Sequence, residues 1–192
     1  MRNCQQLMSS KLLFAIGFCT LATPLAWSQS LNSNTATVVL TATLLESLTV
    51  AATPAAVTFP LIAGGAALGS APVVVTTTWT LGGGRTSVTL VGYFSTATAA
   101  LANVGSPVTN IPTSEVLGQM TTGTPTTYTA FTQTGAVGPA GGGLTLFTQA
   151  ITGTNRSSTR SDNLNLQIDL TTQPQLPSGI YVGTLNLQAQ AL

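Results

Sequence analysis

The amino-acid sequence predicts an all-β protein built as an antiparallel β-sandwich. Three observations indicate this fold. Apolar residues recur at every second position rather than with helical spacing. Clusters of glycine and proline separate the alternating segments. Threonine, whose branched side chain favours strands, makes up about a fifth of the residues after position 28.

Residues 1–28 have the pattern of a secretory signal peptide. Two basic residues precede an apolar run over residues 12–25, which is too short to span a bilayer, and small residues around position 28 predict cleavage before Gln29. We therefore expect residues 29–192 to form a single domain that is secreted, to the periplasm or the cell surface, with no transmembrane segment in the mature chain.

The leader also holds both cysteines, Cys4 and Cys19. Lipid attachment at Cys19 is the alternative to cleavage before Gln29, but the bulky Phe18 stands where that reaction needs a small residue. We expect a mature chain without disulfides, so its stability has to come from apolar packing and strand pairing.

Few charged residues follow the leader. The chain has no histidine, its one lysine lies in the leader, and residues 29–192 carry three arginines against four acidic residues, a net charge of −1. This composition offers no basic patch for nucleic acid or for anionic lipid. A nearly uncharged, threonine-rich surface permits self-association.

The first strands follow from the alternation. Residues 35–44 place one apolar face opposite a mostly threonine face, as in a half-buried strand. The apolar face consists of Ala36, Val38, Leu40, Ala42 and Leu44. Further strands are expected at residues 48–50, 57–61, 73–81 and 86–94, with glycines 82–84 as the hairpin turn between the last two.

The second half of the chain continues this pattern after an ambiguous stretch. Residues 96–102 are rich in alanine and are expected to form one or two helical turns. Strands are expected at residues 111–120, 128–133, 144–151, 163–170 and 181–191, with a loop at 135–143. Several short strands separated by turns predict two packed sheets.

Both ends of the expected domain resemble a known family. The segment from Ala36 to Val50 and the run from Pro177 to Leu185, which contains a G-x-Y-x-G-x-L pattern, are similar to spore-coat-U-like and chaperone-usher-type bacterial pilin domains. The resemblance covers 24 of the 164 residues of the expected mature chain. It implies an immunoglobulin-like sandwich and assembly into surface fibres in which a subunit lends an N-terminal strand to a neighbour.

Two positions depart from the family pattern. Leu48 lies near the place of a cysteine that commonly follows the first strand, and Ala191 replaces a penultimate aromatic residue. Two interpretations of residues 35–44 remain open. The apolar side chains are either inserted into a neighbouring subunit, since an unpaired sheet edge accepts a further strand, or they form the first strand of their own sandwich.

The composition argues against an enzyme. A serine hydrolase needs a base beside its nucleophile, and residues 29–192 contain neither histidine nor lysine. A glycosidase needs two close carboxyl groups, whereas Asp162 and Asp169 are expected ~23 Å apart on opposite faces of one extended segment. Without cysteine or histidine ligands, and with no dense acidic loop for calcium, we expect no catalytic residue, no metal and no cofactor.

Arg156, Arg160 and Asp162 concentrate charge within seven residues. They predict either a recognition loop or a solvated turn in which Arg160 pairs locally with Asp162.

Aromatic residues suggest two roles. Tyr93, Tyr128 and Trp79 are candidates for a sugar-stacking surface, although Trp79 shares its face with apolar residues and is expected in the core. Tyr181, which follows Gly179 in a turn, is expected to tie a loop to the sheet as a tyrosine corner does.

The sequence therefore predicts a structural or surface-assembly protein, with a fibre subunit as its specific form and with copies of itself or related subunits as partners. The alternative is a soluble extracellular module that binds carbohydrate or protein through loops at one end of the sandwich.

Overall fold

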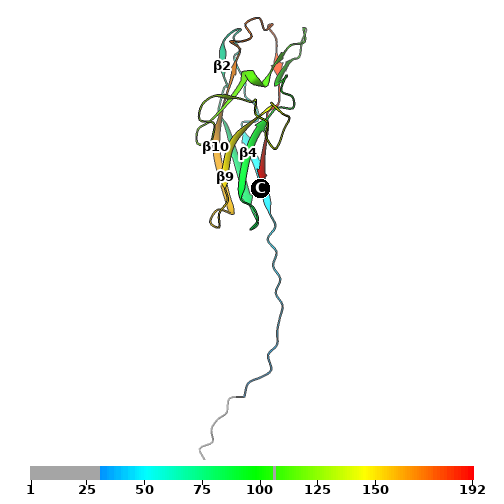
Figure 1. The fold of residues 1–192 in the computed structure, drawn as a ribbon, viewed down its shortest axis with the longest axis vertical. Helices are drawn as coiled ribbons and strands as arrows, with labels where there is room; N and C mark the ends of the chain where they lie inside the picture. Colours follow the sequence, from blue (N-terminus) through cyan, green and yellow to red (C-terminus); the bar gives the residue numbers. More distant parts are fainter. Residues whose placement is uncertain (1–30, 106) are drawn as a thin grey trace, which may run out of the picture. The chain divides into compact units, whose positions relative to one another are not determined.

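The computed structural model describes residues 31–105 and 107–192, in which Ala42–Leu192 forms one compact unit. The expected signal peptide, residues 1–28, lies outside these residues. The compact unit is all-β with antiparallel sheets, and the described residues contain no α-helix (Figure 1). They contain no cysteine either, so no disulfide supports the fold.

Twelve strands are present in the described residues. In chain order they are β1 (Ser47–Thr53), β2 (Ala66–Leu68), β3 (Val73–Thr80), β4 (Ser87–Tyr93), β5 (Leu101–Asn103), β6 (Asn110–Ile111), β7 (Val116–Met120), β8 (Thr129–Ala130), β9 (Gly143–Ala150), β10 (Ser157–Asp169), β11 (Tyr181–Val182) and β12 (Asn186–Ala191). One short 3-10 helix, η1 (Thr113–Glu115), precedes β7.

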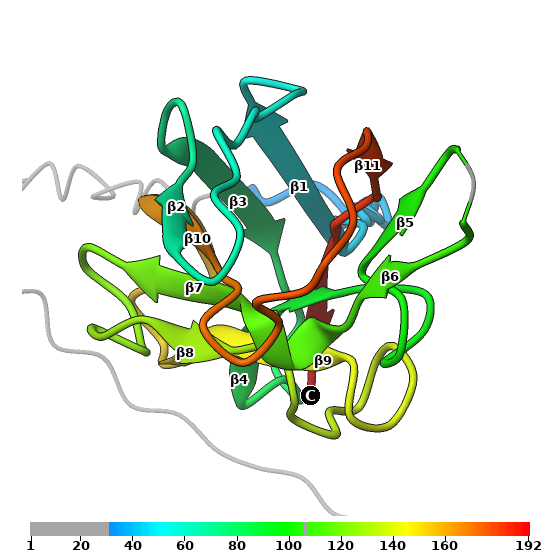
Figure 2. The same cartoon turned by 90° about the horizontal axis from the view of Figure 1, so that it is seen from above.

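The strands form three sheets. The largest has the order β1-β3-β10-β7-β8, with β2 also paired to β10. The second has the order β12-β4-β9 and the third the order β11-β5-β6 (Figure 2). Because β11 and β12 belong to one run of chain, the two small sheets adjoin, and the fold is sandwich-like with the core between the layers.

The core comes from the alternating residues of facing strands. β3 alternates between buried and more exposed positions along its whole length, and its Val75 and Trp79 lie in the same apolar cluster as Leu90 of β4, Leu146 of β9 and Leu164 of β10. Each fully buried aliphatic side chain contributes about 1.5–3 kcal/mol relative to an exposed one.

Glycines 82–84 turn the chain, but the prediction of a hairpin there is wrong. β3 pairs with β1 and β10, whereas β4 pairs with β12 and β9, so the turn carries the chain from one sheet to the other. Alternation identifies the buried face of a strand, and it does not identify the strand that lies beside it.

Three other secondary-structure elements differ from those expected. Residues 96–102 form no helical turn, since β5 begins at Leu101. Residues 57–61 form no strand, and β2 pairs with β10 instead. The strand expected at 111–120 is divided at Pro112, which has no N–H to donate to a ladder.

The segment 35–44 is also not a strand of this structure. Residues 31–46 have no strand partner, and all of their side chains are exposed. The strand at 163–170 is longer than expected, because β10 begins at Ser157.

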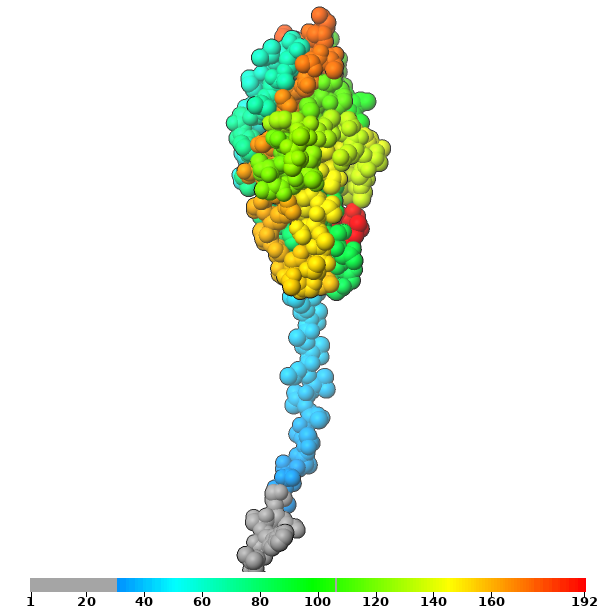
Figure 3. Space-filling model, turned by 60° about the vertical axis from the view of Figure 1, so that its left-hand side comes forward, coloured from blue at the N-terminus to red at the C-terminus, as the bar shows by residue number. Residues whose placement is uncertain are grey.

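The C-terminus ends against the start of β4. The backbone N–H groups of Thr86 and Ser87 donate to an oxygen of Leu192 at 2.5 and 3.1 Å. Figure 3 shows the C-terminal residues in red beside the green residues of this part of the chain. The last strand is therefore anchored at its C-terminal end.

Candidate functional site

Two sheet edges are unpaired on one flank of the sandwich. β1 ends the largest sheet and β12 ends the second, and within the described residues neither edge has a further strand beside it. Cα atoms of β1 and β12 approach within 8 Å of one another. No ladder of hydrogen bonds joins the two strands in this part of the chain.

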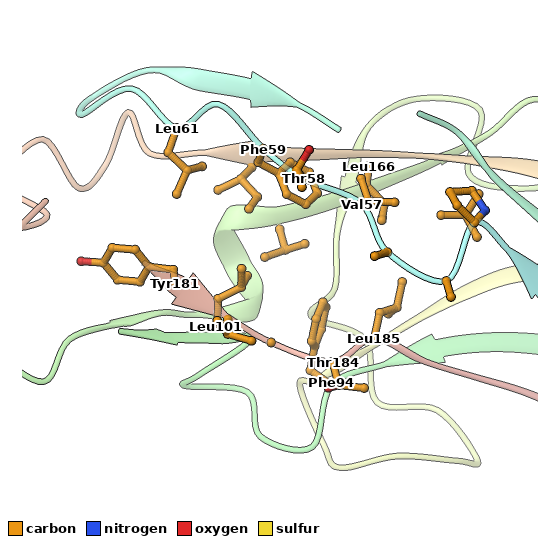
Figure 4. Close-up of a pocket in the computed structure, with 18 of the residues that line it drawn as sticks. Val57, Thr58, Phe59, Leu61, Phe94, Leu101, Leu166, Tyr181, Thr184 and Leu185 are labelled. Carbon is orange, nitrogen blue, oxygen red and sulfur yellow. The ribbon is translucent and has the colours of Figure 1, made fainter. Parts of the chain in front are cut away.

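An apolar groove of about 730 Å³ opens where the two runs of chain diverge. Residues 52–61 form one wall and residues 179–187 the other. Figure 4 shows Phe59 and Leu61 on one side and Leu101, Tyr181 and Leu185 on the other. The floor is made of core side chains, namely Val73, Val116, Leu166 and Ile168.

The walls expose much of their apolar surface. Large side chains of both walls are only partly buried although they pack against the core, among them Val57, Phe59, Leu61, Leu185 and Leu187. None of the residues that line the groove is charged. The walls of the groove are therefore partly open to solvent along this flank, whereas the side chains of its floor are buried.

Residues 57–61 form a wall because they are held close to β10 through residues 69 and 70. The backbone N–H of Ser70 donates to the Thr58 carbonyl at 2.9 Å, and the Ser70 hydroxyl accepts from the Thr58 N–H at 3.2 Å. A Cβ on Gly69 would lie 2.7 Å from the Val57 side chain. Glycine at position 69 therefore allows the wall to lie close to residues 69 and 70 beside β10.

The second wall is tied to the third sheet. The Tyr181 hydroxyl donates to the Pro177 carbonyl at 2.8 Å and lies 2.9 Å from the Thr109 hydroxyl. A Cβ on Gly179 would lie 2.8 Å from the Asn103 amide. These contacts hold the turn before β11 against β5, at the rim of the groove.

The flank of β9 and β10 is closed by an ion pair. Asp162 is 4% exposed, and Arg160 Nε donates to its carboxylate at 2.6 Å. The Thr122 hydroxyl donates to the same carboxylate, and the Arg160 guanidinium lies 4.5 Å from the centre of the Phe147 ring. Burial acts to raise the pKa of Asp162, but the hydrogen bonds from Arg160 and Thr122 and the Arg160 charge outweigh it and lower that pKa.

This arrangement replaces the expected solvated turn. Arg160 and Asp162 do pair, as one of the two interpretations predicted, but they lie inside β10 and point into the sandwich. Arg156 stands apart from them, where its guanidinium donates to the Gly82 carbonyl at 2.5 Å. The three residues form no common recognition loop.

The other acidic residues also bind neighbouring groups. Glu46 pairs with Arg85 at 3.0 Å and accepts from the Gly82 N–H, and these contacts lower the pKa of Glu46. Glu115 accepts from the Thr172 hydroxyl at 2.6 Å. No group of three potential metal ligands occurs among the described residues.

The aromatic candidates do not form one surface. Trp79 is buried in the core, and its indole N–H donates to the Asn155 carbonyl at 2.8 Å. Tyr93 donates to the Gln188 side chain at 3.2 Å on β12. Trp79 therefore cannot stack on a sugar together with Tyr93 and Tyr128.

None of the expected interaction residues is among those that line the groove. The side chains of Ala36, Val38, Leu40, Ala42 and Leu44 are all exposed. The groove itself was not anticipated from the sequence. The only signal for it was the short apolar run at 57–61, which has the composition of a strand but no partner on the groove side.

Comparisons of this chain with protein-family models, with curated proteins and with solved structures give no match. Among the described residues, no helix is long and apolar enough to cross a membrane.

Proposed function

We propose that this protein is an exported structural subunit, with an immunoglobulin-like body that accepts a strand from another chain in its apolar groove. The observation that carries this proposal is the groove of about 730 Å³ that opens between the chain following β1 and the chain leading into β12, two strands at sheet edges. It occurs in a chain that also carries an alternating apolar segment without a strand partner.

A strand is the occupant that suits such a groove. At the groove, the outer edge at the start of β12 has no strand beside it among the described residues, so its backbone N–H and C=O groups can pair with a further strand. The side chains on one face of that strand would pack against the partly exposed walls, among them Val57, Phe59 and Leu185. One added strand would thus pair backbone groups at the edge and cover the partly exposed apolar walls.

Residues 35–44 have the pattern that this occupant needs. Their apolar face is Ala36, Val38, Leu40, Ala42 and Leu44, and the opposite face is mostly threonine. Burying one face while the other stays in water is the behaviour of a half-exposed strand. Exposed aliphatic side chains on an unpaired segment gain free energy when they are covered.

Export and a non-catalytic role agree with the rest of the chain. The leader pattern in residues 1–28 supports passage across a membrane, and a chain that has left the cytoplasm can meet other copies at a surface. The charged side chains form ion pairs or hydrogen bonds with neighbouring residues of the same chain, and none lines the groove. The groove is suited to holding apolar side chains.

The test compares two neighbouring positions of residues 35–44, which we call the extension. Leu40→Asp places a charge on the face proposed to be buried, and Val39→Asp places the same charge on the opposite face. We expect size-exclusion chromatography of the exported chain to show multimers for the parent and for Val39→Asp, and monomers for Leu40→Asp. Equal behaviour of the two variants would contradict strand donation by this segment.

A second measurement addresses the acceptor. A synthetic peptide of residues 35–46 should bind the Leu40→Asp chain, whose own groove is intact, and raise its melting temperature. At a peptide concentration of about 100 times the dissociation constant, the expected stabilisation is about 2.7 kcal/mol. A peptide with the Leu40→Asp change is the control and should have no effect.

A further inference from the structure

Three large aliphatic side chains form an exposed patch beside the groove. Val104 and Ile180 are 69% exposed and Val182 is 56% exposed. Val182 lies opposite Ala102 in the register of β11 and β5, and the Val104 N–H donates to the Ile180 carbonyl at 3.0 Å. Alternation places all three on the outer face of the third sheet. Single exposed aliphatic residues are ordinary, whereas neighbouring ones mark a contact surface.

The patch adjoins the wide part of the groove. Ile180 and Val182 belong to the groove wall as well as to the patch. At the other end of this flank β1 and β12 approach within 8 Å, less than the roughly 10 Å that two strand spacings need. A donated strand therefore has most room beside the patch.

The extension matches this difference in width. Leu44 lies at the C-terminal end of its apolar face and Leu40 at the centre, whereas the small Ala36 lies at the N-terminal end. If Leu44 lies in the wide part and Ala36 toward the narrow part, the largest side chain lies where the groove is widest. The opposite direction would force leucines between strands that lie too close together.

The connection from the extension to the body of the donor is short. Only Leu45 and Glu46 separate Leu44 from the first residue of β1, and these three steps span at most ~11 Å. The donor's body must therefore touch the acceptor at the end where Leu44 leaves the groove. With Leu44 in the wide part, that end carries the aliphatic patch.

The opposite end of the flank would be a poorer contact. A smaller hollow of about 360 Å³ lies there, lined in part by Glu46 and Arg85, which already pair with each other at 3.0 Å. A contact at that end would have to cover charged groups that are now solvated, which costs free energy. The aliphatic patch gains free energy when covered.

We propose that Val104, Ile180 and Val182 form a second contact surface for another copy of this chain, which rests its body there while its extension fills the groove. The connecting residue Leu45, itself 78% exposed, contacts this patch. The inference rests on the proposed strand donation, and it adds the end of the acceptor at which the donor sits.

Cysteine cross-linking tests the position of the donor, because residues 29–192 contain no native cysteine. A Leu45→Cys chain is mixed with a Val182→Cys chain, or with a Gly84→Cys chain as the control for the opposite end. Gly84 is exposed, and an added Cβ there meets no atom within 4 Å. Under mild oxidation we expect a disulfide-linked heterodimer with Val182→Cys and none with Gly84→Cys.

Each alternative result has a separate meaning. Cross-linking to Gly84→Cys, or to neither position while multimers persist, would overturn the patch contact and leave strand donation intact. Loss of multimers in both the Leu40→Asp and the Val39→Asp chains would instead overturn strand donation by residues 35–44.

A pair of matched substitutions measures the contribution of the patch. Val104→Thr, at a patch residue that does not line the groove, keeps the β-branched shape and replaces a methyl group by a hydroxyl. Val74→Thr makes the same change on the outer face of β3, away from groove and patch. We expect Val104→Thr to raise the concentration for half-assembly by about tenfold. Val74→Thr should leave it unchanged, and an equal effect of the two would count against the patch.

Discussion

The two flanks of this sandwich differ in the side chains that lie beside an unpaired strand edge. Beside β9, residues 157–163 of β10 extend past the end of β7, and the inward pair of Arg160 and Asp162 closes the gap. On the flank of β1 and β12, no charged side chain lines the groove, and the apolar side chains of its walls stay partly exposed. Inward-pointing charges prevent a foreign strand from adding to an edge, whereas an apolar edge accepts one.

This comparison separates stability from assembly. The closed flank is held within one chain, since the charges of Arg160 and Asp162 and the hydroxyl of Thr122 find partners there. The open flank leaves side chains partly buried that a further strand would cover. Substitutions on the closed flank should therefore act on the free energy of unfolding, and those on the open flank mainly on association.

The largest expected effect comes from the aliphatic core. Leu164→Ala removes a side chain that is 0% exposed, and it should cost about 4 kcal/mol of unfolding free energy. Leu187→Ala, in the groove wall and only partly buried, should cost the isolated chain about 1 kcal/mol. Urea unfolding of both variants checks this contrast, and equal losses would show that the groove wall is as well packed as the core.

The second-largest loss of unfolding free energy is expected when the ion pair of Arg160 and Asp162 is broken. Asp162→Ala leaves Arg160 without its carboxylate in a partly buried place, and we expect a loss of about 3 kcal/mol. For a domain of this size that corresponds to a drop of roughly 10 °C in melting temperature. Asp169→Ala is the control on the same strand, because that carboxylate accepts only from the exposed turn at Thr171. A small effect at both positions would mean that the closed flank does not depend on its charges.

Acid should remove the contribution of the Asp162 carboxylate to the free energy of unfolding. The pKa of Asp162 is held below its ordinary value of 3.8 in the folded state. Its contribution is therefore fully present above that value and is lost as the pH falls through the lower folded pKa. Urea midpoints between pH 7 and pH 2 should fall less steeply for Asp162→Asn than for the parent. Parallel curves would exclude this carboxylate as a source of acid sensitivity.

The smallest effect is expected at the exposed pair beside the open flank. Glu46→Gln removes the partner of Arg85, but both side chains are well exposed. Such pairs contribute little and are screened by salt. Melting temperatures of the variant and the parent should differ slightly at low salt and agree at 1 M salt. A difference that persists in high salt would assign Glu46 a packing role at the start of β1.

The sequence predicted some elements well for a physical reason. β3 and β10 alternate strictly, so their buried faces could be read from neighbouring residues. The same rule failed for Gly82–Gly84, where the turn joins two sheets rather than two paired strands. It also placed a strand at residues 57–61, which have strand-like composition but form a groove wall.

Only one part of the candidate site, the alternating apolar segment, could be predicted from the sequence. The alternating apolar residues of the extension were visible because they follow one another along the chain. The groove was not, because its walls at 52–61 and 179–187 are far apart in the chain and meet only through the sheets between them. No local pattern records which two edges come to lie side by side.

Composition and alternation were sufficient to establish an all-β chain with apolar faces to bury and few charges, since these properties are local and additive. Strand order was decided by the folded structure, because pairing depends on which distant faces cover one another. That order left β12 at a sheet edge and turned the Arg160–Asp162 pair inward on the opposite flank. The contrast between an edge that is closed and one that stays open thus exists only in three dimensions.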